Sequence, residues 1–170
     1  MKTTVKLFSL LLFCSISLSA FCQKDALLST LPQTKEEFVA SEKNVLATIN
    51  WLANTPADQD ADKRKEQFAM LTAWIINSPT VTIEVNSNVL TFTKKNSDLL
   101  IYFMAGWTKF ALENNYSKDL VKSNLAGIRM AMNIYQKGIA MKKDKEMEKL
   151  IEKESSGTLE SWVTEQLAKK

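Results

Sequence analysis

The residue types that most often carry catalysis are scarce in this chain. It contains no histidine, and its two cysteines, Cys14 and Cys22, both lie close to the N-terminus. Beyond residue 22 no serine stands three residues before a lysine, so a hydroxyl and an amine are not placed one helical turn apart. The four glycines are scattered, which excludes a glycine-rich phosphate loop. Only carboxylate chemistry remains as a catalytic route.

The acidic residues do not indicate a catalytic or metal site. None interrupts an otherwise apolar run, where a raised pKa would be expected. Asp58-Gln59-Asp60-Ala61-Asp62 has the alternating acids of a calcium loop, but Lys63 replaces the required glycine and Ala69 the closing glutamate. We interpret these acids as the first turn of a helix. We therefore expect no catalytic residue, no metal site, no cofactor and no enzyme.

The first 22 residues are typical of a secretory signal peptide. Lys2 and Lys6 provide the basic start, and residues 7–18 form an apolar middle that is too short for a membrane anchor. Cleavage after Cys22 would leave Gln23 first, and Phe21 before that cysteine argues against a lipoprotein. We expect residues 23–170 to form one domain, without disulfides, in the periplasm or outside the cell.

The mature chain is nearly neutral. Loss of Lys2 and Lys6 takes the basic residues from 22 to 20, against 19 acidic residues. This balance gives no electrostatic basis for binding nucleic acid. We also expect no stable membrane insertion, because the most apolar run after the signal, residues 99–107, is far shorter than the roughly 20 residues that span a bilayer.

The run over residues 99–107 predicts the central helix of the fold. It contains no charged residue and is apolar on every side of a helical wheel, which is typical of a helix covered on all sides. Ser97 is the expected N-cap, with Asp98 facing the positive end of the helix dipole.

A second helix over residues 118–137, capped by Ser117, should run antiparallel to this one, because only about three residues connect the two. Folding the pair about residues 116 and 117 places Gly106 level with Gly127. Since glycine inside a helix costs roughly 1 kcal/mol relative to alanine, two at one level indicate close backbone approach.

The remaining segments predict an all-α, bundle-like domain of about six helices. A capping box formed by Thr34 and Glu37 begins the first, and Asp144 and Thr158 begin the last two. Residues 80–85 alternate between apolar and polar side chains and then give way to a short turn over 87–93. We favour an extended segment laid over the helices, and a hairpin with residues 89–92 is the alternative.

Three side chains at the edges of the central helices are the candidate binding residues. Tyr102 and Trp107 join apolar bodies to polar tips, and Arg129 offers a planar donor fork. Each also has a structural interpretation, which is core packing for the aromatic residues and an ion pair or a helix cap for Arg129.

Several stretches resemble uncharacterised exported helical proteins of the Bacteroidetes. They are the signal ending in Ala-Phe-Cys-Gln and residues 50–52, 62–65, 78–82, 112–118 and 142–145. The resemblance covers most of the mature chain and implies an exported, all-helical fold without an assigned activity.

Together these features predict an exported, non-catalytic binding or scaffold module with a protein, peptide or lipid partner. The alternatives are a carboxylate-dependent enzyme acting on envelope polymers and a structural component of an envelope complex.

Overall fold

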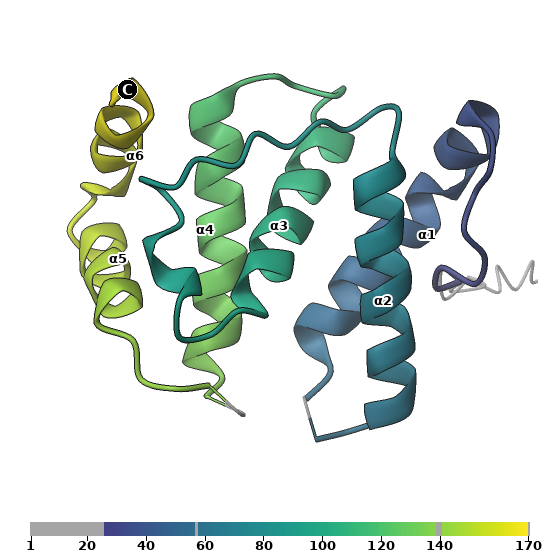
Figure 1. The fold of residues 1–170 in the computed structure, drawn as a ribbon, viewed down its shortest axis with the longest axis horizontal. Coiled ribbons are helices and arrows are strands. Elements are labelled where there is room, and N and C mark those ends of the chain that lie inside the picture. The colour runs from purple at the N-terminus through teal and green to yellow at the C-terminus, as the bar shows by residue number, and fades with distance from the viewer. Residues whose placement is uncertain (1–25, 57, 139–140, 170) are drawn as a thin grey trace, which may run out of the picture.

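The structure is a computed structural model that describes residues 26–56, 58–138 and 141–169. Within these ranges the chain forms six α-helices, one short 3-10 helix and no strand (Figure 1). The elements are α1 Lys35–Asn54, α2 Ala61–Asn77, η1 Thr91–Thr93, α3 Leu99–Glu113, α4 Leu120–Gln136, α5 Lys145–Ser155 and α6 Leu159–Ala168. The predicted all-α fold is confirmed. The predicted signal peptide, residues 1–22, lies outside the described residues.

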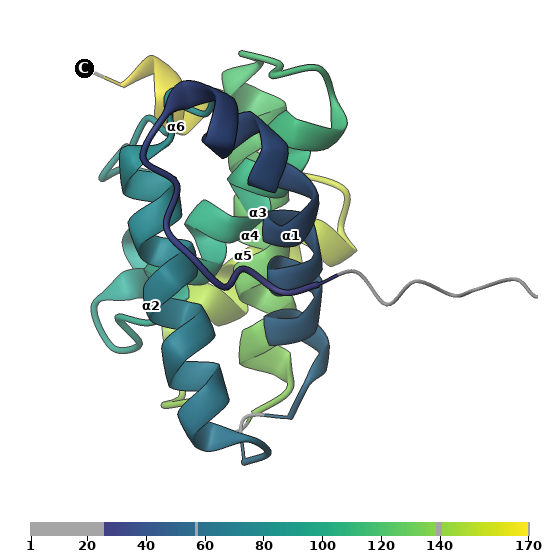
Figure 2. The ribbon, with the colours of Figure 1, turned by 90° about the vertical axis from the view of Figure 1, so that its right-hand side faces the viewer.

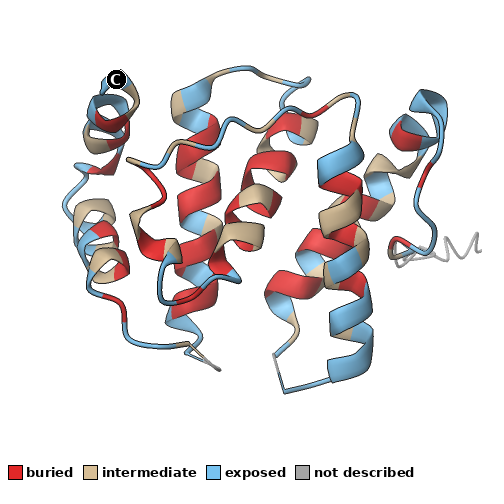
Figure 3. Ribbon diagram, viewed as in Figure 1, coloured by how far each residue is buried: buried red, intermediate tan, exposed pale blue. Residues whose placement is uncertain are grey.

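The α3–α4 pair forms the middle of the molecule. α1 and α2 pack against α3, while α5 and α6 pack against α4 (Figures 1 and 2). Eight of the 15 residues of α3 are buried, which requires neighbours on several sides of the helix (Figure 3). This burial confirms the central position that the uncharged run predicts.

The predicted glycine contact between α3 and α4 is confirmed. A Cβ atom added to Gly106 would lie 2.5 Å from the carbonyl oxygen of Ala126 and 2.7 Å from Cβ of Met130. A Cβ atom added to Gly127 would lie 2.6 Å from the ring of Phe103. Real Cβ atoms do not approach other atoms this closely, so both positions require glycine.

The start of α3 differs from the prediction. Its N-cap is Asp98 instead of Ser97, and the side chain of Asp98 makes no capping hydrogen bond. The backbone carbonyls of Asn96 and Ser97 accept hydrogen bonds from the N–H groups of Leu99 and Leu100. A tight turn thus satisfies the first donors of α3 without a side chain.

The start of α4 also differs, and Ser117 as its cap was wrong. The cap is Asp119, whose Oδ1 accepts a hydrogen bond of 3.0 Å from the N–H group of Lys122. Asn115 and Tyr116 both have a positive φ, so the chain needs residues 114–119 to reverse its direction. The other predicted caps, Thr34 with Glu37 and Asp144, are present.

Residues 78–90 cross the α3–α4 pair as an irregular segment and lead into η1 (Figure 1). The N–H groups of Val89 and Leu90 both donate to the carbonyl of Asn86, which forms a turn instead of the alternative hairpin. Val81 is buried, whereas Val85 is 61% exposed, so the predicted alternation holds only for the first part of the segment.

Candidate functional site

The structure does not bring the three predicted binding residues together. Tyr102, Trp107 and Arg129 each line a different hollow of the described surface. Trp107 is only 3% exposed and lies below the irregular segment, where it lines a small cavity of about 170 Å³ with Val81 and Ala111. Of the two interpretations of Trp107, the core position fits its burial.

Arg129 forms the ion pair that was one of its two predicted roles. Its Nε and Nη2 donate hydrogen bonds of 2.7 and 3.2 Å to the two carboxylate oxygens of Glu154, which joins α4 to α5. This bidentate contact raises the pKa of Arg129 and occupies its donor fork. The edge of the guanidinium that would bind a ligand carboxylate in bidentate fashion is therefore occupied by Glu154.

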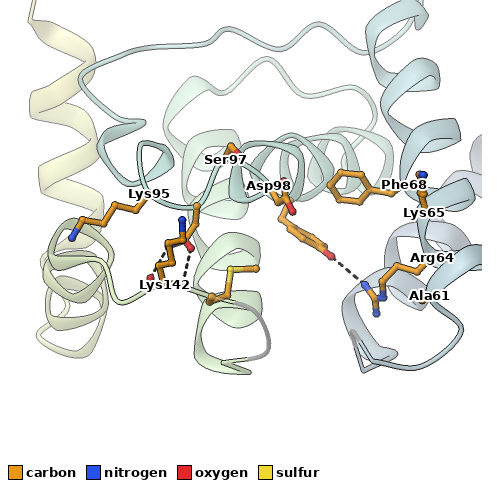
Figure 4. Close-up of a pocket in the computed structure, with 11 residues that line it drawn as sticks. Ala61, Arg64, Lys65, Phe68, Lys95, Ser97, Asp98 and Lys142 are labelled. Atoms are coloured by element: carbon orange, nitrogen blue, oxygen red, sulfur yellow. Dashed lines mark hydrogen bonds between the residues drawn. The ribbon is translucent and has the colours of Figure 1, made fainter.

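Tyr102 lines a cavity with a volume of about 430 Å³. The N-terminal turns of α2 and the residues that lead into α3 form two of its walls, and residues 141 and 142 form a third (Figure 4). Figure 4 shows Arg64 and Lys142 on opposite sides of this cavity. We call it the Arg64 cavity.

Arg64 is held in the cavity wall by neutral oxygen atoms. Its Nη1 donates hydrogen bonds of 3.1 Å to the carbonyl of Leu52 and to the hydroxyl of Tyr102, and its Nη2 donates to the carbonyl of Thr55. The two carbonyls belong to the C-terminal end of α1, which has no basic residue of its own in its last turn. Arg64 thus supplies the cation that the negative end of α1 favours.

No carboxylate of the described residues neutralises Arg64. No described acidic side chain lies within ion-pair distance of its guanidinium, and its Nε is buried without an acceptor. The guanidinium also lies 5.8 Å from the centroid of the Trp51 ring, and this aromatic face is a weak partner for a cation. The cavity wall therefore contains a positive charge without a counter-ion.

The opposite wall depends on one buried amide. Asn96 is 7% exposed, and its side chain both donates to the carbonyl and accepts from the N–H group of Lys142, each at 2.8 Å. This paired contact fixes residues 141 and 142 against the loop before α3. The side chain of Asn96 therefore holds Met141 and Lys142 in the cavity wall.

The cavity combines apolar walls with an excess of positive charge. Phe68 and Tyr102 pack at 5.6 Å between ring centroids, and Met141 adds a flexible thioether. The described residues that line the cavity include four cationic side chains and one carboxylate, that of Asp98; the cations are Arg64, Lys65, Lys95 and Lys142. This local excess departs from the near-neutral balance of the chain.

The hydroxyl of Tyr102 has a proton to donate. It accepts from Arg64, and its own O–H makes no hydrogen bond to a described residue. Burial raises the pKa of this hydroxyl from its ordinary value of 10.0, although the neighbouring Arg64 acts in the opposite direction. The phenol is therefore neutral at physiological pH and can donate a hydrogen bond into the cavity.

The acids of residues 58–62 lie at the N-terminal end of α2, as the helix interpretation predicts. Asp62 lies in the first turn, and Asp60 is the N-cap in a left-handed conformation with φ of 50°. Across the residues that can be described, no group of three or more histidine, cysteine or acidic side chains could hold a metal ion.

Sequence reasoning missed Arg64, Asn96 and Lys142. A signal for Arg64 existed, because it is one of only two arginines, but it lies in the run Lys63-Arg64-Lys65, which is typical of a solvated helix face. Nothing in the sequence marks Asn96 or Lys142, since their pairing joins segments 46 residues apart.

The fold and the cavity define an all-α bundle with a cationic, partly apolar pocket between its helices. None of the described helices has the length and apolarity to cross a membrane. Comparison with protein-family models, with curated proteins and with solved structures finds no match to this chain.

Proposed function

We propose that this protein is an exported, non-catalytic binding module, and that the Arg64 cavity receives part of a protein, peptide or lipid partner. One observation carries the proposal: apolar walls, an unneutralised guanidinium and a free hydroxyl donor occur in the same cavity. Its volume of about 430 Å³ falls in the range of small-ligand pockets, roughly 300–1,000 Å³.

The side chains around the cavity support binding without catalysis. Hydrolysis by carboxylates needs two acids that face the same bond, and among the described residues Asp98 is the only acid in the cavity wall. The sequence after residue 22 has neither the histidine nor the cysteine of the common nucleophile–base pairs. The signal-like sequence of residues 1–22 and the resemblance to exported Bacteroidetes proteins support export.

A thermal-shift screen tests the proposal. The full chain is expressed in an exporting host, and the purified protein is screened against a library of small organic molecules that includes lipid and peptide fragments. We expect hits that raise Tm and that are lost in Ser97→Trp, which fills the cavity from an exposed position in its wall. Ser161→Trp, at an exposed position of α6, is the matched control.

Two results of the screen would contradict the Arg64 cavity as the binding site. Hits that persist in Ser97→Trp would place binding elsewhere, and the absence of any hit would contradict the cavity as a binding site. Turnover of an envelope polymer that is abolished by Asp98→Asn would instead favour the enzyme alternative.

A further inference from the structure

We infer that the Arg64 cavity selects organic anions, namely ligands that join a single anionic head to an apolar body of about the size of a phenylalkyl group. This inference rests on the proposed function, because it assigns a ligand class to the same cavity. The charges, the free hydroxyl donor and the apolar walls of the cavity each support this ligand class.

The charge of the cavity calls for an anion. The ammonium group of Lys95 donates to the carbonyl of Lys143 and points away from Arg64 (Figure 4), so it is not counted. Arg64, Lys65 and Lys142 remain, and none of them has a carboxylate partner among the described residues. Asp98 is the single opposing charge in the wall.

The hydrogen-bonding groups also favour an acceptor head. Arg64 and the lysines can only donate, and the Tyr102 hydroxyl already uses an acceptor site for Arg64. A carboxylate only accepts hydrogen bonds, so it matches the Tyr102 O–H and the cationic side chains of the wall, all of which donate. A neutral head would leave the positive charge of Arg64 without a counter-ion.

The apolar walls select the rest of the ligand. The rings of Phe68 and Tyr102 are tilted by 60° and offer faces and edges for an aromatic group. Met141 can adapt to the shape of the ligand because its side chain is unbranched. A simple inorganic anion would interact with the cationic side chains but would leave these apolar walls in contact with water.

The experiment compares three probes that share one apolar body. The probes are 4-phenylbutyrate, 4-phenylbutanol and 4-phenylbutylamine, and calorimetry measures their binding to the protein purified from an exporting host. We expect the anion to bind at least about tenfold more tightly than the alcohol, because its head makes charge-assisted hydrogen bonds. The amine should bind most weakly.

Two substitutions should change the affinity in opposite directions. Lys142→Met removes a cation and should weaken 4-phenylbutyrate about two- to fivefold, whereas Asp98→Asn removes the opposing charge and should strengthen it by a similar factor. Both positions are exposed and neither side chain makes a hydrogen bond, so the fold should persist. Lys122→Met, in the first turn of α4 and at the opposite end of that helix from residues 141 and 142, should leave the affinity unchanged (Figure 1).

The outcomes test the selectivity for organic anions separately from the proposed binding function. Equal binding of the three probes, lost in Ser97→Trp, would overturn the anion selectivity and leave the cavity as a binding site. Preference for the amine, or effects of the same sign in Asp98→Asn and Lys142→Met, would also overturn it. If none of the probes binds, the selectivity is refuted, and the library screen still decides the proposed function.

Discussion

Gly106→Ala should destabilise the protein even though alanine is the better helix former. At a helix position with free space this change stabilises by about 1 kcal/mol. Here the new Cβ would lie 2.5 Å from a backbone carbonyl oxygen of Ala126, where ordinary contact begins at 3.4 Å. The contacting atom belongs to the backbone of α4, so the two central helices must move apart.

The expected size follows from these two opposing effects. Overpacking of a close core typically costs 1–3 kcal/mol, and this contact with rigid backbone belongs at the upper end of that range. After the gain in helix propensity we expect a net loss of about 2 kcal/mol, or a fall in Tm of about 4–8 °C for a domain of this size.

Urea unfolding followed by circular dichroism at 222 nm measures this change. The midpoint should fall while the slope with urea stays unchanged. Ala69→Gly, at an exposed position of α2, measures the effect of helix propensity without a change in core packing. It should lower the free energy of unfolding by about 1 kcal/mol. If Gly106→Ala stabilises by about as much as Ala69→Gly destabilises, the inferred close approach of α3 and α4 is refuted.

Three further predictions concern caps, the cavity wall and titration. Thr34→Ala should lose about 1 kcal/mol in the same urea assay, because it breaks the capping box of α1, and no loss would contradict that cap. Asn96→Ala should lose about 1–3 kcal/mol, because it leaves both backbone groups of Lys142 unpaired, whereas Asn114→Ala at an exposed position should cost much less. The folded state holds the Tyr102 proton more tightly than the unfolded state, because the pKa of Tyr102 is raised on folding. The protonated hydroxyl therefore contributes to the free energy of unfolding. This contribution is complete below pH 10.0 and is lost as pH rises through the raised pKa. The phenolate absorbance of the native protein at 295 nm should therefore rise above pH 10.0. Tyr102→Phe should reduce the loss of stability in that pH range. A phenolate midpoint below pH 10.0 would contradict the raised pKa of Tyr102.

Local patterns in the sequence predicted the central part of the fold well. The uncharged run over residues 99–107 specifies a buried helix, and the two glycines specify the register of α3 on α4, because both signals act over short distances. The caps that failed, Ser97 and Ser117, lie where the backbone makes turns with its own carbonyls or with positive φ angles. Asparagine is enriched at positive φ, so Asn115 carried a weak signal for the turn before α4, but nothing in the sequence marks the positive φ of Tyr116.

The cavity was less accessible to sequence reasoning. Its walls come from three segments that are distant along the chain, and the contacts that fix them join residues 64 with 102 and 96 with 142. Tyr102 could be chosen because it lies on an apolar helix and carries a polar tip. Arg64 could not be separated from its lysine neighbours, because only tertiary packing turns it toward α1.

The most direct test of the proposed binding site is the mapping of a ligand onto the structure by NMR. Backbone amide signals of the isotope-labelled protein are followed during a titration with 4-phenylbutyrate. We expect saturable shifts confined to residues 61–68, 95–102 and 141–142, which surround the Arg64 cavity. Shifts that instead cluster around Trp107 or Arg129 would contradict the cavity as the binding site, and no shifts at high ligand concentration would refute its selectivity for organic anions.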